Sequence, residues 1–144
     1  GIDFGELKAA IEEARGGASP RGASTITMQV VKNVFLWPGR SYVRKALELP
    51  LALVLEVVWS KQRILEVYLN IAEWGAGTYG IEAAARQAFN KRAAQLTASE
   101  GARLAVVLPN PVERDPSDLE PRTERVAEIV EGRMRRTVNT ACLD

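Results

Sequence analysis

The clearest structural pattern in the chain lies in residues 41–74, which read SYVRKALELPLALVLEVVWSKQRILEVYLNIAEW. Ser41 is suited to cap a helix of residues 41–59, in which Pro50 removes one backbone hydrogen bond and bends the axis. A second helical stripe follows over residues 61–74, where apolar side chains recur at the spacing of one helix face. The stretch therefore predicts two consecutive helices that bury apolar faces.

Helical periodicity continues on both sides of this stretch. Further helices are predicted at residues 4–14, 24–34, 81–89 and 97–109, and from Pro121 onwards. A glycine-rich turn at Gly75, Gly77 and Gly80 follows the central helices, and prolines mark a loop before the last one. No segment shows the alternation of a strand, so the predicted fold class is all-α.

Composition allows one compact domain and argues against several classes of protein. The 144 residues are enough for a single domain spanning 1–144, and 47% apolar with 26% charged residues is typical of a globular protein. A net charge of +1 gives no bulk attraction for nucleic acid, so no nucleic-acid partner is expected. With no histidine and only Cys142, the chain lacks the usual zinc ligands and any disulfide framework.

Two features concern the membrane and the ends of the chain. The longest apolar run, residues 49–59, is about half the length that spans a bilayer and predicts a core helix. The chain opens at Gly1 without an initiator methionine, so we expect it to be a piece of a longer protein.

The first candidate site residues lie near the start of the helix predicted at 24–34. They are Ser24, Thr25, Gln29, Lys32 and Asn33. A helix N-terminus with free hydroxyls, followed by an amide and a lysine, is able to hold an anion or a sugar. The alternative is an ordinary helix cap with a solvated polar face, which the pattern alone favours.

A second candidate group is basic and lies on the long central helix. Arg40, Arg44 and Lys45 fall within six residues and are dense enough to clamp a diphosphate. Glu48 lies one turn after Arg44 and opens onto the apolar run. The alternative is a surface ion pair of little energetic value.

A third candidate pair follows on the next helix. Glu66 and Asn70 are four residues apart, so Asn70 is placed to fix the Glu66 carboxylate. By itself this spacing is weak evidence for a site.

Together these segments resemble the peptidoglycan glycosyltransferase family, and within it the monofunctional biosynthetic transglycosylases. The family's second motif resembles GASTITMQVVKN at residues 22–33, although Ala23 and Met28 depart from its usual residues. The third motif, RKxxE, matches residues 44–48, the fourth matches residues 61–70, and the fifth, RxxxVL, matches residues 103–108. Four motifs in order are more specific than any one of them.

The resemblance implies a lysozyme-like helical domain with a small membrane-facing lobe. That lobe is expected between the second and third motifs, where residues 34–38 and Tyr42 supply apolar and aromatic surface beside Arg40. The alternative for this segment is a hydrophobic staple between two helices.

The resemblance also implies a reaction and the roles of the candidate residues. A glutamate of the family's first motif acts as general base on the 4-hydroxyl of lipid II, which attacks the growing chain on undecaprenyl diphosphate and forms a β-1,4 linkage by inversion. Lys32, Arg40 and Arg44 are then expected to neutralise the diphosphate, with Lys45 beside them. Glu48 is expected to be catalytic, either assisting the leaving group or organising the cations. The remaining polar groups, including Glu66 and Asn70, are expected to bind substrate.

The expected partners follow from that reaction. They are lipid II, the growing glycan chain and the membrane, with a transpeptidase and division proteins as further candidates. The resemblance implies the bacterial cytoplasmic (inner) membrane as location, with the catalytic domain on the periplasmic or outer side. No resident cofactor is expected, although a divalent cation such as Mg²⁺ is able to assist the diphosphate.

One departure from the family limits these expectations. The first motif is absent, and Gly1 corresponds to its last glycine, so we expect the general base to lie upstream and these 144 residues alone to have little or no activity. Two other functions stay open: a lysozyme-like hydrolase or lytic transglycosylase, and a non-catalytic adaptor that binds lipid II.

Overall fold

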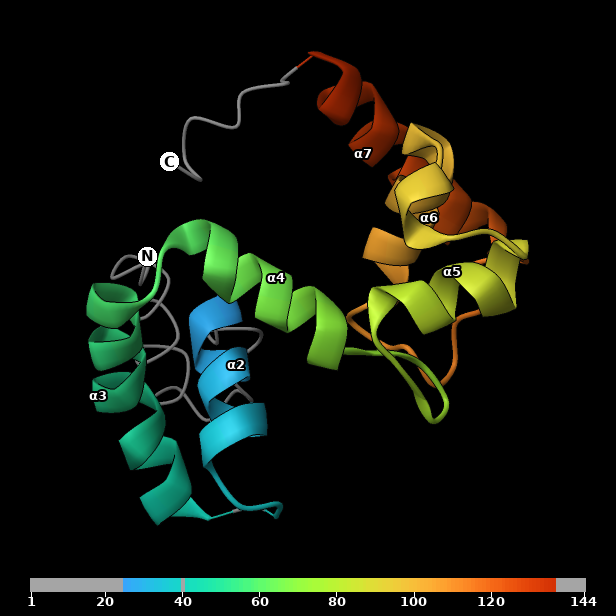
Figure 1. Cartoon of the computed structure of the whole chain (residues 1–144). Coiled ribbons are helices and arrows are strands. Elements are labelled where there is room, and N and C mark those ends of the chain that lie inside the picture. Colours follow the sequence, from blue (N-terminus) through green and yellow to red (C-terminus); the bar gives the residue numbers. More distant parts are fainter. Residues whose placement is uncertain (1–24, 40, 137–144) are drawn as a thin grey trace. The chain divides into compact units, whose positions relative to one another are not determined.

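The structure is a computed structural model that describes residues 25–39 and 41–136 (Figure 1). These residues form two compact units, residues 25–68 without 40 and residues 69–136, and each is described by itself. Ser24, Arg40, Cys142 and the helix predicted at residues 4–14 lie outside the described residues.

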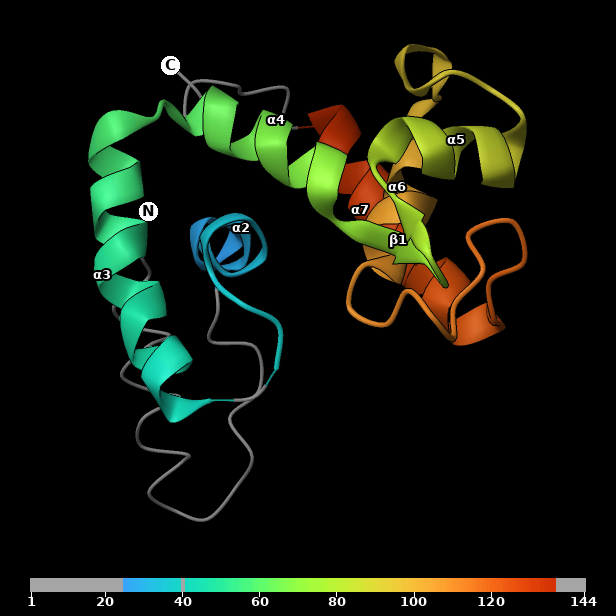
Figure 2. The same ribbon diagram turned by 60° about the horizontal axis from the view of Figure 1, so that its bottom comes forward.

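The first unit contains α2 (Ile26–Phe35), α3 (Tyr42–Val58) and most of α4 (Lys61–Ile71). Helix α2 lies beside α3, as Figures 1 and 2 show from two directions. Their contact buries Val30 and Val31 of α2 together with Ala52 and Leu55 of α3. The helical pattern predicted at residues 24–34 and 41–59 is therefore confirmed.

Local chemistry explains where the helices of the first unit begin and end. The Thr25 hydroxyl caps α2 by accepting a hydrogen bond from the Met28 amide at 3.3 Å. Ser41 occupies the N-cap position of α3, but its side chain makes no capping hydrogen bond. Pro50 lies inside α3 on the exposed side, where its missing N–H leaves one helical hydrogen bond unmade.

The second unit is also helical, apart from one small hairpin. Its elements are β1 (Glu73–Gly75), β2 (Thr78–Tyr79), α5 (Ile81–Phe89), the short 3₁₀ helix η1 (Ala93–Gln95), α6 (Ala98–Val107) and α7 (Pro121–Arg136). Helix α6 packs against α7 and buries Leu104, Val107 and Ala127. The chain is thus mostly helical, which agrees with the predicted all-α class and is consistent with a lysozyme-like domain.

The hairpin corrects one prediction. The helical stripe expected as far as residue 74 ends at Ile71, and the glycine-rich turn forms two antiparallel strands. Gly77 at the turn and Gly80 after it have φ of +71° and +85°, values that favour glycine. The strands are too short to show the alternation by which a sequence reveals a strand.

Helix α6 and the loop after it are held by polar contacts. Thr97 and Glu100 form the predicted capping box at the start of α6, and α7 begins at Pro121 as predicted. The Arg103 guanidinium donates to the carbonyls of Pro116 and Ser117 at 2.8 and 3.2 Å. These bonds anchor the loop of residues 108–120 to α6.

Across residues 25–39 and 41–136, none of the helices has the length and hydropathy needed to cross a bilayer.

Candidate functional site

The candidate residues on α2 share its polar face. Thr27, Met28, Val30 and Val31 are buried on one side of α2. On the opposite side, Lys32 and Asn33 are exposed and Gln29 is half-buried. The hydroxyl of Thr25 accepts the capping hydrogen bond of α2, as the sequence predicted. Lys32 and Asn33 remain accessible to a ligand.

Glu48 is a buried carboxylate that forms two ion pairs within α3. Its carboxylate is buried, with 2% of the residue exposed, and faces two cations of the same helix. Arg44 Nη1 donates to Oε1 at 3.1 Å, and Lys45 Nζ donates to Oε2 at 2.6 Å. We call these three residues the Glu48 cluster. A buried carboxylate requires such partners, so the pair is not the surface ion pair considered from the sequence.

The two cations of the Glu48 cluster differ in exposure. The Arg44 side chain is 15% exposed and that of Lys45 is 54% exposed. Arg44 Nε is buried and has no hydrogen-bond acceptor within the described part of the chain. With one carboxylate against two cations, the cluster carries a formal charge of +1, which suits an anionic ligand.

Glu66 and Asn70 lie on the exposed side of α4, one turn apart. Glu66 accepts a hydrogen bond from Arg63 at 2.7 Å, and both side chains of this pair are more than half exposed. The structure therefore places the Arg63 guanidinium beside the Glu66 carboxylate.

A second, partly buried carboxylate was not predicted from the sequence. Glu56 accepts hydrogen bonds from the Thr27 hydroxyl of α2 and from the Lys61 ammonium at the start of α4. Glu56 lies eight residues after Glu48 and so on the same face of α3, and Thr27 falls within the apolar stripe of α2. The presence of polar Thr27 within that apolar stripe was the sequence feature that could have indicated this contact.

The segment expected to face the membrane is exposed in part. Val34, Phe35, Trp37 and Tyr42 all present apolar surface to solvent, and Tyr42 is almost fully exposed. The Phe35 ring also lies 6.3 Å from that of Trp59, centroid to centroid. The segment thus combines a contact between helices with an exposed aromatic surface.

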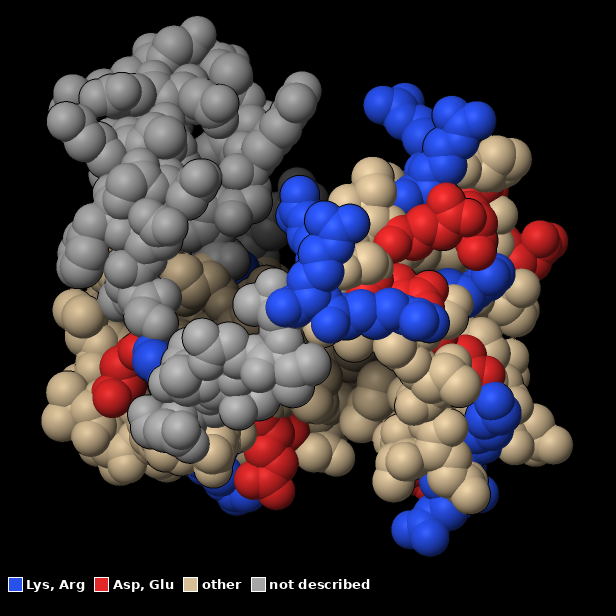
Figure 3. Space-filling view, turned by 90° about the horizontal axis from the view of Figure 1, so that it is seen from above, with Lys and Arg blue, Asp and Glu red and all other residues tan. Residues whose placement is uncertain are grey.

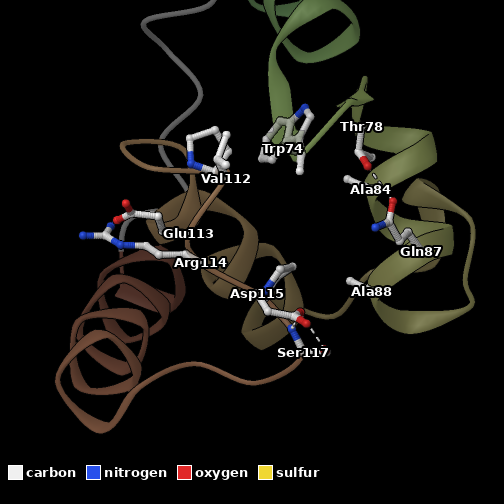
Figure 4. A pocket seen from close by; sticks show the side chains of 13 residues that line it. Trp74, Thr78, Ala84, Gln87, Ala88, Val112, Glu113, Arg114, Asp115 and Ser117 are labelled. Carbon is white, nitrogen blue, oxygen red and sulfur yellow. Dashed lines mark hydrogen bonds between the residues drawn. The ribbon is translucent and has the colours of Figure 1, made fainter.

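The second unit contains a cavity of about 250 Å³ (Figure 4). It is lined by Trp74, Ala76, Thr78, Ala84, Gln87, Ala88 and residues 111–117. No candidate residue from the sequence lines it. Hydrogen bonds from the Ser117 hydroxyl and amide lower the pKa of Asp115, and the lining combines this carboxylate and Glu113 with the cation Arg114.

Charge on the described surface is mixed. On the face seen in Figure 3, Lys and Arg side chains lie beside Asp and Glu side chains. In the described ranges, no group of three or more His, Cys, Asp and Glu side chains is placed to hold a metal ion. The described groups best suited to an anion are therefore the Glu48 cluster and the accessible lysine of α2.

Comparison with known proteins places the chain in a family. A family model described as Transglycosylase matches residues 1–135. The chain is 57% identical over 137 residues to the biosynthetic peptidoglycan transglycosylase of Brucella suis biovar 1, covering 95% of this chain and 61% of that protein. It is 52% identical to the protein of that name from Rhizobium meliloti, covering 95% of this chain and 58% of that protein. The chain spans about three fifths of the length of the curated relatives it matches. On this evidence the chain belongs to the transglycosylase family.

Proposed function

We propose that the protein polymerises the glycan strands of peptidoglycan. The observation that carries this proposal is the Glu48 cluster, a buried carboxylate held between two cations, in a chain of the transglycosylase family. Relatives more than half identical to the chain bear the name biosynthetic peptidoglycan transglycosylase. The proposed substrates are lipid II and the growing glycan chain.

The proposed reaction is a glycosyl transfer with inversion. The 4-hydroxyl of lipid II loses its proton to the general base, and its oxygen bonds to the anomeric carbon of the growing chain. The bond from that carbon to the diphosphate oxygen breaks, and the electron pair leaves with undecaprenyl diphosphate. The α-linked donor thus becomes a β-1,4 linkage. In this proposal the general base is a residue of the family's first motif.

Cations of this chain stabilise the leaving group in the proposal. Lys32 is exposed on α2, Arg44 and Lys45 flank Glu48 on α3, and Arg40 precedes α3 in the sequence. Charge that develops on a diphosphate in a partly dry cleft makes each such cation worth several kcal/mol. Glu48 orients Arg44 and Lys45, because its two carboxylate oxygens accept from one cation each. The unused Nε donor of Arg44 gains an acceptor when an anion enters.

The remaining candidate residues bind the sugar and the phosphates in this proposal. Gln29 and Asn33 extend the polar face of α2, whose N-cap is Thr25, and Ser24 precedes Thr25 in the sequence. Glu66 and Asn70 extend the polar side of α4. Amides, hydroxyls and carboxylates of this kind recognise the hydroxyls of sugars.

The membrane supplies the substrate in the proposal. Exposed Phe35, Trp37 and Tyr42 suit a bilayer interface, where aromatic rings are favoured. We therefore place the protein at the cytoplasmic membrane, with this domain on its outer side, and a transpeptidase and division proteins remain proposed partners. No resident cofactor is needed, since the cations named above neutralise the diphosphate; a Mg²⁺ ion would bind chiefly through the substrate's phosphates.

Lipid II polymerisation tests this function. The assay compares the 144-residue chain with a version extended upstream through the first motif, and then with Glu48→Gln and Arg44→Ala in the extended version. We expect polymer from the extended version, little from the shorter chain, and a large loss in both variants. Digestion of preformed glycan would instead support a hydrolase, and binding of lipid II without turnover would support an adaptor.

A further inference from the structure

The partly buried carboxylate of Glu56 on α3 joins three helices. Thr27, with 4% of the residue exposed, donates its hydroxyl hydrogen from α2 to Glu56 Oε1. Lys61, at the first position of α4, donates to Glu56 Oε2. The Glu56 side chain is only 16% exposed. We call these three residues the interhelix lock.

We propose that the interhelix lock sets the rotation of α2, so that its polar face presents Lys32, Gln29 and Asn33 to the lipid diphosphate. Thr27 and Glu56 are positioning residues in this proposal and do not touch substrate. The inference rests on the proposed function, because it assigns the lock to the site that binds lipid II.

Apolar packing turns the apolar stripe of a helix inward but defines its rotation only coarsely. Met28, Val30 and Val31 bury the inner face of α2, but the attraction between apolar groups has no preferred direction. The Thr27 hydrogen bond is directional and ends on a carboxylate of another helix. It therefore specifies which side of α2 faces α3.

The geometry of a helix links Thr27 to the ligand side. At about 100° per residue, Lys32 and Gln29 lie roughly 140° and 200° around the axis from Thr27. Holding Thr27 against α3 thus directs both away from α3, as their exposure shows. A rotation of α2 by one residue position, or about 100°, would turn the Lys32 side chain through that angle and away from the ligand.

Lys61 offsets the cost of removing the Glu56 carboxylate from water. A buried carboxylate without a cation is costly, and the Lys61 ammonium supplies the opposite charge at the junction of α3 and α4. Along α3, Glu56 follows Glu48 by two turns, or about 12 Å. One carboxylate of this helix therefore orients the cations and the other orients the neighbouring helix.

A coupling experiment distinguishes positioning from mere stability. Binding of fluorescent lipid II in detergent micelles is measured for the full-length protein with Thr27→Val, Lys32→Ala, Arg44→Ala, and the two doubles that contain Thr27→Val. We expect Thr27→Val to weaken binding roughly five- to tenfold. Because Lys32 lies on α2 and Arg44 on α3, Lys32→Ala should cost less in the Thr27→Val background, while the cost of Arg44→Ala should not change.

Two controls separate the lock from stability. Thr27→Ser keeps the hydroxyl and should restore binding. Val30→Ala, which destabilises the same helix without touching the lock, should bind lipid II normally below its unfolding temperature. If Thr27→Val does not fold, Glu56→Gln replaces it as the background in which the cost of Lys32→Ala is measured.

The outcomes are distinct. A smaller cost of Lys32→Ala in the Thr27→Val background, with an unchanged cost of Arg44→Ala and rescue by Thr27→Ser, supports the lock. Equal binding by Thr27→Val and Val30→Ala, or an unchanged cost of Lys32→Ala in both backgrounds, overturns it. Loss of any effect of Lys32→Ala and Arg44→Ala in the otherwise unaltered protein overturns the proposed site itself, and the inference with it.

Discussion

Replacing Glu48 with glutamine tests whether its carboxylate is buried between two cations. Glu48→Gln keeps the shape of the side chain and removes its charge, so Arg44 and Lys45 lose the group that compensates them. The glutamine amide also turns a donor toward one of the two cations, because only one of its two polar ends accepts hydrogen bonds.

The expected loss of stability follows from the exposure of the two cations. Removing one partner of a fully buried ion pair costs about 3–5 kcal/mol, whereas exposed pairs are worth about 0–1 kcal/mol. Lys45 is half exposed and is able to turn to water, whereas Arg44 is mostly buried. We therefore expect a loss of about 2 kcal/mol, between these limits.

Urea unfolding of the 144-residue chain, followed by tryptophan fluorescence and circular dichroism, measures this loss. With a slope of about 1–3 kcal/mol per molar urea, the midpoint should fall by about 1 M. Glu66→Gln is the matched control, because it removes a carboxylate from an exposed pair with Arg63 and should cost under about 0.5 kcal/mol. Equal midpoints for the two variants would refute the burial of Glu48 between its cations.

Three further predictions concern the hairpin, the pH dependence and metal ions. Gly80→Ala should cost about 2 kcal/mol or more in a melting experiment, because φ is +85° and a Cβ would lie 2.9 Å from the Asn70 carbonyl oxygen, whereas Gly77→Ala meets no atom and should cost about 1 kcal/mol. A hydrogen bond from Lys91, followed by the Thr97 amide, lowers the pKa of Glu100 from 4.5 to about 2, so its stabilisation is present above pH 4.5 and is lost as the pH falls toward 2. The melting temperature of Glu100→Gln should therefore fall less between pH 5 and pH 2 than that of the unaltered chain, and parallel curves would contradict this. EDTA should weaken lipid II binding less than about threefold in a fluorescence titration, because in the proposed site cations of the chain neutralise the diphosphate, and a greater loss would assign that role to a metal ion.

Local patterns predicted the helices well, because their signals lie within a few residues. The periodicity of residues 81–89 predicted α5, and the Thr97 and Glu100 capping box predicted the start of α6. The hairpin after α4 was missed because its strands have three and two residues, too few to alternate. Its signal was the spacing of glycines, which predicted a turn but not the pairing around it.

The candidate site was predictable to the extent that it is local. The spacing of Arg44 and Glu48 predicted their contact, since both lie on one helix. The burial of Glu48 depends on tertiary packing around α3, which no local pattern reports. The contact of Thr27 with Glu56 joins residues 29 positions apart, so only the folded chain reveals it.

The most direct test of the central claim is whether the basic groups around Glu48 recognise a lipid diphosphate. Binding of a polyprenyl diphosphate to the 144-residue chain is compared with binding of the matching polyprenyl alcohol, in the same detergent and with Arg44→Ala beside the unaltered chain. We expect the unaltered chain to bind the diphosphate more tightly than the alcohol, and Arg44→Ala to lose most of that preference. Equal affinity for the two lipids, or a preference that Arg44→Ala leaves intact, would contradict it.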